Sequence, residues 1–178
     1  KGKGVMRERN YTDVDGMITN VPGICLVTSY ADCVPLYFVD PVKKAIGLSH
    51  SGWRGTVGKI GKVTIEKMGE LYGTKPEDIV ACIGPSICQK CYEISEEVAV
   101  QFKEAFPDNI KEILIDKGNG KYQLDLWECN RINFKEAGVL PENIKVTDIC
   151  TCHNTDVLFS HRGHNGKRGN LGAFLSIV

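Results

Sequence analysis

The chain has 178 residues, enough for one domain with a sizeable core, and its 42% hydrophobic and 25% charged residues are ordinary for a soluble globular protein. Its 22 Lys and Arg balance its 22 Asp and Glu, so the overall charge gives no reason to expect nucleic acid or a membrane surface as a partner. No apolar run reaches the ~18 residues of a membrane span. Several of the eight cysteines lie inside apolar segments, which favours free thiols in a reducing cytoplasm over a disulfide scaffold.

The chain opens with Lys1 rather than Met, and no helix or strand pattern precedes about Asp15. We therefore expect residues 1–14 to be the lead-in of a truncated domain and residues 15–178 to form the domain itself. Short apolar runs bounded by Gly and Pro predict the first strands, which cover 17–19, 24–29, 34–39 and 44–49.

The apolar period then changes, so residues 56–72 predict a helix that ends at Gly73. The remaining elements are expected in this order: a strand over 79–83, a helix capped by Ser95 and ended by Pro107, a polar loop over 107–120 with a short apolar piece at 113–115, a helix from Asp125 through Ala137, and strands over 144–148, 157–159 and 171–177. This order predicts a single mixed α/β domain with a mainly antiparallel or mixed sheet.

Residues 73–79 resemble residues 138–144, and each stretch follows a predicted helix and precedes a predicted strand. Each is therefore interpreted as a helix stop, a turn and the start of a strand. Convergent loop chemistry and a duplication both explain the similarity.

The predicted hairpin over 34–49 carries a thiol and an imidazole at its open end. Folded about Pro41 and Val42, it places Asp40 opposite Lys43 and Cys33 opposite His50. Directly opposed strand residues have Cβ atoms roughly 4.5–5.5 Å apart, which suits one metal ion or one thiolate–imidazolium pair. A longer loop that shifted the pairing by one residue would place the two side chains on opposite faces. A buried Cys and a hydrogen-bonded His, without chemistry, is the alternative.

Polar residues follow the hairpin. Trp53, Arg54 and Thr56 open the predicted helix, and helix N-termini bind anions while a guanidinium suits phosphate or carboxylate. Gly52 and Gly55 allow the backbone to approach a ligand closely. A turn with Trp53 in the core is the alternative.

Three other segments are candidates. Gly84-Pro85-Ser86 ends a predicted strand, where it is either a binding loop or a plain turn. Cys88 and Cys91 have zinc-knuckle spacing, and 150–153 is a candidate partner for a structural zinc, although Cys150 and Cys152 are not spaced as a second knuckle. The basic loop from His161 to Arg168 follows a strand and is either phosphate-facing or solvated.

Five motifs occur in an order typical of one family. They are Ala31-Asp32-Cys33-Val34-Pro35, His50-Ser51-Gly52-Trp53-Arg54-Gly55-Thr56, Ile83-Gly84-Pro85-Ser86-Ile87, Cys91-Tyr92-Glu93, and Cys150-Thr151 with Phe159-Ser160-His161-Arg162. The chain resembles the laccase-domain family, labelled multicopper polyphenol oxidase and also described as zinc-dependent purine nucleoside phosphorylase. The resemblance implies an α/β sandwich with mixed sheets, phosphorolysis of adenosine, inosine and methylthioadenosine, and adenosine deamination.

The resemblance also implies site residues. Cys33 and His50 match the family's metal ligands and, with Asp32 and Arg54, are expected to be catalytic. Residues expected to bind the nucleoside or phosphate are Ser51, Gly52, Trp53, Thr56, Gly84, Ser86 and Arg162. The family's third ligand is a His in a Gln-x-His motif that lies upstream of the matched region and is missing from this sequence. Two further departures are the separated Cys88 and Cys91, where relatives carry adjacent cysteines, and Gly163, where a second Arg is usual.

The leading hypothesis is therefore a zinc-dependent purine nucleoside phosphorylase that uses small-molecule substrates. One rival is a copper-dependent polyphenol oxidase, although multicopper sites need many His ligands and the chain has four His. A second rival is a metal-free hydrolase built on Cys33 and His50, and a third is an inactive fragment that binds a partner. The oligomeric state is not predicted.

Overall fold

A five-stranded sheet forms the centre of the molecule. The structure is a computed structural model that describes residue 12 and residues 14–178, so the expected lead-in over 1–14 lies almost wholly outside the described residues. The strands follow the order β1 (Gly16–Thr19), β4 (Ala45–Ser51), β3 (Val34–Asp40), β5 (Val80–Ile83) and β9 (Ile144–Val146). Neighbours pair antiparallel except β5 and β9, which pair parallel. The predicted mixed sheet is confirmed.

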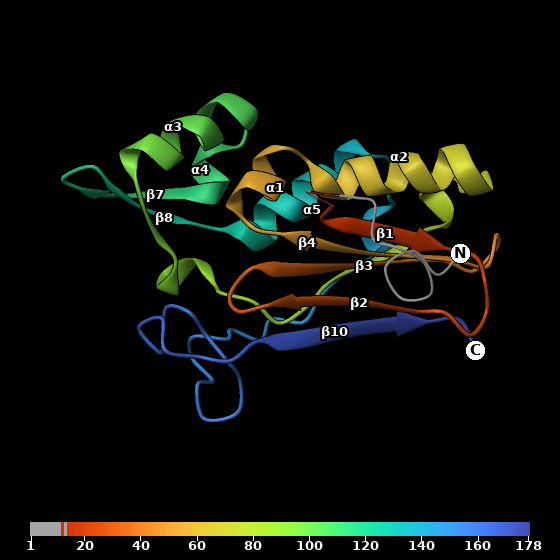
Figure 1. Ribbon diagram of the computed structural model, residues 1–178. Helices are drawn as coiled ribbons and strands as arrows, with labels where there is room; N and C mark the ends of the chain where they lie inside the picture. The colour runs from red at the N-terminus through yellow and green to blue at the C-terminus, as the bar shows by residue number, and fades with distance from the viewer. Residues whose placement is uncertain (1–11, 13) are drawn as a thin grey trace.

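The sheet is covered on both faces (Figure 1). On one face lie α1 (Trp53–Val57), α2 (Ile60–Tyr72) and α5 (Leu126–Glu136). On the other lies an antiparallel ribbon of β2 (Cys25–Tyr30) and β10 (Leu171–Ser176). A small antiparallel sheet of β6 (Glu93–Ser95), β8 (Lys121–Leu124) and β7 (Leu114–Gly118) extends from one end together with α3 (Glu96–Ala105) and α4 (Ile110–Ile113). These layers confirm the predicted sandwich of mixed sheets and helices.

Two apolar clusters hold the layers together. The larger one lies between the central sheet and the helices, where the rings of Phe38 and Phe134 meet edge to face with centroids 5.3 Å apart. The smaller one joins the sheet to the ribbon through Leu26, Leu48 and Ala173. Because β3 and β4 are buried on both faces, they give the site at their ends a rigid support.

The hairpin of β3 and β4 differs in register from the expected one. Asp40 pairs with Ala45 and Pro35 with His50, so Cys33 does not face His50. The cause is a longer connection, in which Asp40 Oδ1 accepts hydrogen bonds from the backbone N–H groups of Val42 and Lys43 at 2.8 and 2.9 Å. The pairing is shifted by two residues, and a shift of two keeps every side chain on its expected face.

The expected helix over 56–72 is two helices. Lys59 adopts a left-handed conformation with φ of 53° and separates α1 from α2, so the first of these has only five residues. Gly73, with φ of 69°, ends α2 as predicted. The predicted helices beginning after Ser95 and Asp125 are also confirmed, and the Asp125 carboxylate accepts from Glu128 N–H.

Two predictions in polar segments are wrong. Residues 157–159 lie in turns rather than a strand, because a backbone turn closes Leu158 N–H onto the Asn154 carbonyl. The expected loop over 107–120 contains α4 and β7, which the pairing with β8 stabilises. In the part of the chain that the structure describes, no helix is both long and apolar enough to cross a membrane.

Candidate functional site

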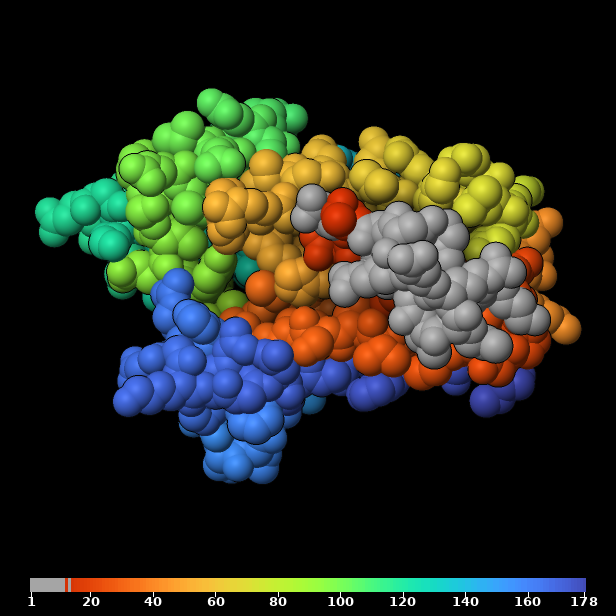
Figure 2. Space-filling model, viewed as in Figure 1, coloured from red at the N-terminus to blue at the C-terminus, as the bar shows by residue number. Residues whose placement is uncertain are grey.

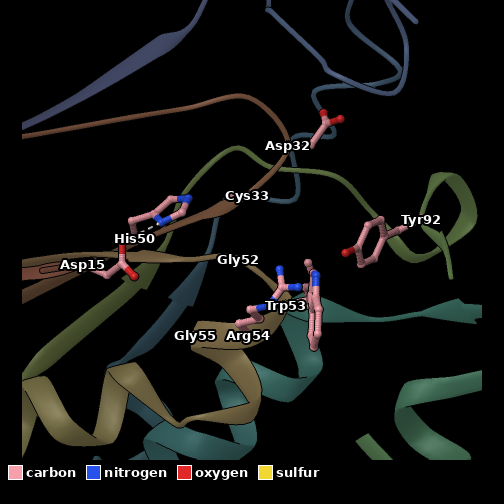
Figure 3. Close-up of a pocket in the computed structure, with 10 residues that line it drawn as sticks. Asp15, Asp32, Cys33, His50, Gly52, Trp53, Arg54, Gly55 and Tyr92 are labelled. Carbon is pink, nitrogen blue, oxygen red and sulfur yellow. Dashed lines mark hydrogen bonds and ion pairs between the residues drawn. The ribbon is translucent and has the colours of Figure 1, made fainter. Parts of the chain in front are cut away.

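A pocket of about 290 Å³ opens where β4 passes into α1. It combines the open end of the β3–β4 hairpin with the first turn of α1 and side chains from three other segments. Its lining residues are Asp15, Asp32, Cys33, His50, Gly52, Trp53, Arg54, Gly55, Tyr92 and Leu126 (Figure 3). The structure therefore brings together the predicted candidates Asp32, Cys33, His50, Gly52, Trp53 and Arg54.

Cys33 and His50 lie diagonally across the hairpin on one face. His50 is opposite Pro35, and the next position outward on that face brings Cys33 beside Gly52. Gly52 is needed there, because a Cβ on it would lie 3.2 Å from Cys33 Sγ. His50 Nδ1 lies 3.2 Å from Asp15 Oδ1, so this carboxylate orients the ring. Burial raises the pKa of the Cys33 thiol, and the negative charge of Asp32 raises it further.

The two side chains fit part of a zinc site. Thiolate sulfur and imidazole nitrogen are donors that zinc takes, and both residues line the same pocket. Within residue 12 and residues 14–178, however, no trio of His, Cys, Asp or Glu that includes Cys33 and His50 has its ligand atoms all within 4.8 Å. Cys33 and His50 are therefore at most two members of a ligand set.

Aromatic rings and guanidinium groups flank the opening of the pocket. The guanidinium carbon of the exposed Arg54 lies 4.1 Å from the ring centroid of Trp53. Tyr92 lies across from Trp53 and points toward it (Figure 3). The guanidinium carbon of Arg162 is 5.3 Å from the ring centroid of Tyr92. Stacked in this way, Arg54 still presents donors for an anion.

Ser51 and Thr56, both predicted to bind ligand, are fully buried and do not line the pocket. Their hydroxyls lie 2.9 Å apart, and Ser51 Oγ donates to Asn130 Oδ1 at 3.0 Å. Thr56 Oγ1 also donates to the Gly52 carbonyl at 2.9 Å. The pair therefore fixes the start of α1 against α5. Since α1 is so short, its dipole is small, and anion binding at this end depends on Arg54.

Asp32 connects three loops. It has a left-handed backbone with φ of 78° and is buried. Its Oδ1 accepts a hydrogen bond from Thr151 Oγ1 at 2.6 Å, and its Oδ2 accepts one from the Arg162 N–H at 2.7 Å. The Arg162 side chain donates to the Glu93 carbonyl at 2.9 Å. Both Asp32 oxygens are thus engaged by the chain itself, which suits a positioning role beside Cys33.

Gly84 and Ser86 also lie outside the pocket lining. Ser86 is fully buried, donates to the Gly84 carbonyl at 3.0 Å and accepts from Trp127 Nε1 at 2.6 Å. A Cβ on Gly84 would lie 2.7 Å from Pro35 Cγ. Gly84 and Ser86 therefore contribute to packing behind the hairpin rather than to the lining of the pocket.

The sequence did not single out Asp15, Tyr92 or Leu126 as site residues. Asp15 reaches His50 because β1 pairs with β4, and the His50 N–H donates to the Asp15 carbonyl at 2.7 Å. Tyr92 belongs to the Cys91-Tyr92-Glu93 motif, which was the one available signal. Leu126 begins α5 and gives the pocket an apolar floor.

Known proteins share this sequence and architecture. The sequence profile described as "Multi-copper polyphenol oxidoreductase laccase" matches residues 2–178. The chain is 38% identical over 163 residues to the "Purine nucleoside phosphorylase YlmD" of Bacillus subtilis (strain 168), covering 92% of this chain and 58% of that protein. It is 39% identical over 165 residues to the "Purine nucleoside phosphorylase" of Bacteroides thetaiotaomicron, covering 93% and 61%.

Solved structures agree with the sequence relatives. The "hypothetical protein YfiH" of Bacillus licheniformis superimposes with a TM-score of 0.89 at 34% identity, over 92% of this chain and 61% of that one. YlmD from Geobacillus stearothermophilus gives a TM-score of 0.88 at 36% identity, over 92% and 61%. The chain spans about 60% of the length of these bacterial relatives. These matches confirm the resemblance drawn from the five motifs: the chain belongs to the multi-copper polyphenol oxidoreductase laccase family.

Proposed function

We propose that the pocket at the end of the β3–β4 hairpin contributes to phosphorolysis of purine nucleosides such as adenosine, inosine and methylthioadenosine. The observation that carries the proposal is the convergence of Cys33 and His50 with Arg54 and two aromatic rings on one small pocket. The names of relatives at 38% and 39% identity, which are purine nucleoside phosphorylases, support the reaction class.

Zinc is the metal we propose for Cys33 and His50, because their donor set suits it and the pocket exposes both side chains to a ligand. When bound, Zn²⁺ supplies Lewis-acid polarisation and orients the ligand it contacts. The chain supplies the orientation of the His50 ring through Asp15, and the placement of Cys33 through Asp32 and Gly52.

Phosphate is proposed to bind at Arg54. Its guanidinium is exposed, held over Trp53, and free to donate two parallel hydrogen bonds to an anion. Arg162 adds positive charge behind Tyr92. In this arrangement the phosphate oxygen attacks the anomeric carbon of the ribose while the bond to the base nitrogen breaks. The products are the free purine and ribose 1-phosphate, or 5-methylthioribose 1-phosphate where the substrate is methylthioadenosine.

The purine is proposed to stack between Trp53 and Tyr92. The two rings lie on opposite sides of the pocket, and a planar base gains favourable contact with an aromatic face (Figure 3). The same placement would let a water molecule attack C6 of adenosine and displace ammonia, a side reaction that gives inosine.

Phosphate-dependent release of hypoxanthine from inosine tests the proposal. We expect release that saturates with phosphate, and a loss of at least ~100-fold in Cys33→Ala and His50→Ala, while Cys25→Ala on the distant ribbon keeps wild-type turnover. Arg54→Gln should raise the KM for phosphate by about tenfold to a hundredfold, because a charge-assisted hydrogen bond is worth roughly 1.5–3 kcal/mol. Unchanged turnover in the Cys33 and His50 variants would refute the proposal.

A copper-dependent phenol oxidase is the second candidate, since the matching family carries that description. Copper binds N/S sites more tightly than zinc does, so metal content must be measured on protein purified without added copper. Copper at stoichiometric level together with oxidation of phenols would favour this candidate.

The metal-free hydrolase has less support. Among the hydrogen bonds of the described residues, none joins Cys33 to His50, and burial raises the pKa of the Cys33 thiol away from the reactive thiolate. Inactivation by iodoacetamide without protection by zinc would favour it.

A further inference from the structure

We propose that Cys88, Cys91, Cys150 and His153 form a second metal site, which binds one structural Zn²⁺ apart from the pocket. Their four ligand atoms all lie within 4.8 Å of one another. His153 Nε2 is 3.1 Å from Cys91 Sγ, and His153 Nδ1 is 3.8 Å from Cys88 Sγ. None of the four residues lines the pocket, so the site does not depend on the proposed phosphorolysis.

The distances suit a tetrahedral zinc ion. Zn–S bonds of about 2.3 Å and Zn–N bonds of about 2.0 Å place neighbouring ligand atoms roughly 3.5–3.8 Å apart. The four ligand atoms lie within 4.8 Å of one another, so a zinc ion would draw them together and take one of the two His153 ring nitrogens. Three Cys and one His, with no open position, is a common ligand set of structural rather than catalytic zinc.

The local backbone is arranged as in a zinc knuckle. A 3-10 turn over Gln89–Cys91 brings Cys91 back beside Cys88, and the Cys91 N–H donates to the Cys88 carbonyl at 3.1 Å. The Cys88 N–H donates to Cys150 Sγ at 3.4 Å, which stabilises negative charge on that sulfur. Cys150 is buried whereas His153 is exposed, so the cluster lies between the interior and the surface.

The spacing of the second half is resolved by the structure. Cys150 and Cys152 are only two residues apart, which does not match the spacing of a zinc knuckle. In the structure, the residue that joins Cys150 in the cluster is His153. Cys150 and His153 are three residues apart, as are Cys88 and Cys91. Cys152 packs instead against the larger apolar cluster.

The metal would brace the wall of the pocket. Cys91 is followed directly by Tyr92, which lines the pocket, and Cys150 is followed by Thr151, which donates to Asp32 at 2.6 Å. Figure 2 shows the segment between β9 and β10, in blue, as a projecting lobe at one end of the molecule. A zinc ion would fasten the base of this lobe to the segment that carries Tyr92.

Zinc content separates this site from the pocket. We expect the double variant Cys33→Ala/His50→Ala, purified with zinc and without chelator, to retain one zinc ion per chain. Cys88→Ser/Cys91→Ser should lose one zinc ion relative to wild type, whereas Cys25→Ser should lose none. The paired substitution removes two of the four proposed ligands at once.

X-ray absorption on Cys33→Ala/His50→Ala gives a direct check, since all four proposed ligands are intact in that protein. We expect three sulfur neighbours at about 2.3 Å and one nitrogen at about 2.0 Å. A zinc-free double variant, a shell made only of oxygen and nitrogen, or a Cys88–Cys91 disulfide in protein purified without oxygen would overturn the proposal. Failure of phosphorolysis would leave these readouts unchanged, so the two proposals fail separately.

Discussion

Asp32 offers a graded test of how the pocket is positioned. Its carboxylate accepts hydrogen bonds from Thr151 Oγ1 at 2.6 Å and from the Arg162 N–H at 2.7 Å, and its backbone is left-handed with φ of 78°. A hydrogen bond to a charged group is worth roughly 1.5–3 kcal/mol, so Asp32→Ala should lose about 3–6 kcal/mol from the two bonds. An Ala at positive φ costs about 1–2 kcal/mol more, whereas Gly does not.

Three substitutions separate these effects. Asp32→Asn keeps the shape of the side chain, and its amide can donate a hydrogen bond to the Thr151 hydroxyl. The free energy of unfolding should fall by only about 1–2 kcal/mol, because the hydrogen bonds are no longer made to a charged group. Asp32→Gly should be less stable than Asp32→Asn but more stable than Asp32→Ala by about 1 kcal/mol. Urea denaturation followed by tryptophan fluorescence measures the free energy of unfolding for all of them. If all three variants stay within about 0.5 kcal/mol of wild type, the carboxylate does not organise these loops.

Three other substitutions test the packing and ionisation of the core. Asn130→Ala should cost about 2–4 kcal/mol in urea denaturation, because it leaves the buried Ser51 hydroxyl without its acceptor; an unchanged midpoint would contradict this. Gly61→Ala should lower stability by about 1–3 kcal/mol, since the new Cβ would lie 2.7 Å from the buried Phe134 ring; a gain from helix propensity would show that the ring moves freely. Burial raises the pKa of Tyr30 well above its usual range, so the unfolded chain loses this proton near pH 10 while the folded one keeps it. Above pH 10, wild type should therefore lose about 1.4 kcal/mol per pH unit more than Tyr30→Phe, and equal slopes would refute the assignment.

In the β3–β4 hairpin, the local sequence predicts the positions of the strands but not their register. Apolar runs bounded by Gly or Pro predicted the ends of β3 and β4 to within two residues of the observed ends. The prediction succeeds because both strands are buried and their sequences are therefore mostly apolar. The register could not be predicted, since it depends on the Asp40 side chain holding a four-residue connection rather than a tight turn. The shift of two residues preserved the faces, so the expectation that Cys33 and His50 share one site survived an incorrect pairing.

Other parts of the site depend on long-range packing that no local pattern records. The family resemblance implied that Ser51 and Thr56 bind the ligand, but both hydroxyls are hydrogen-bonded to Asn130 of α5. Tyr92 enters the pocket only because β6 pairs with β8, and both strands are too short and polar to be recognised. Pairing of this kind compensates for weak strand propensity, which explains why the small third sheet was not predicted.

The sequence singled out Cys88, Cys91 and residues 150–153 as candidates for one zinc site, and the fold explains why these segments meet. The stretches beginning at Gly73 and Gly138 lead into β5 and β9, and these two strands pair parallel, so their carboxyl ends meet at one edge of the sheet. The chain continues this pairing beyond the strands through a bridge between Ser86 and Cys150. Parallel pairing of β5 with β9 therefore places the segment that follows β5, with Cys88 and Cys91, beside the segment that follows β9, with Cys150 and His153. This juxtaposition depends on the order of strands in the sheet, which no local pattern in the sequence records.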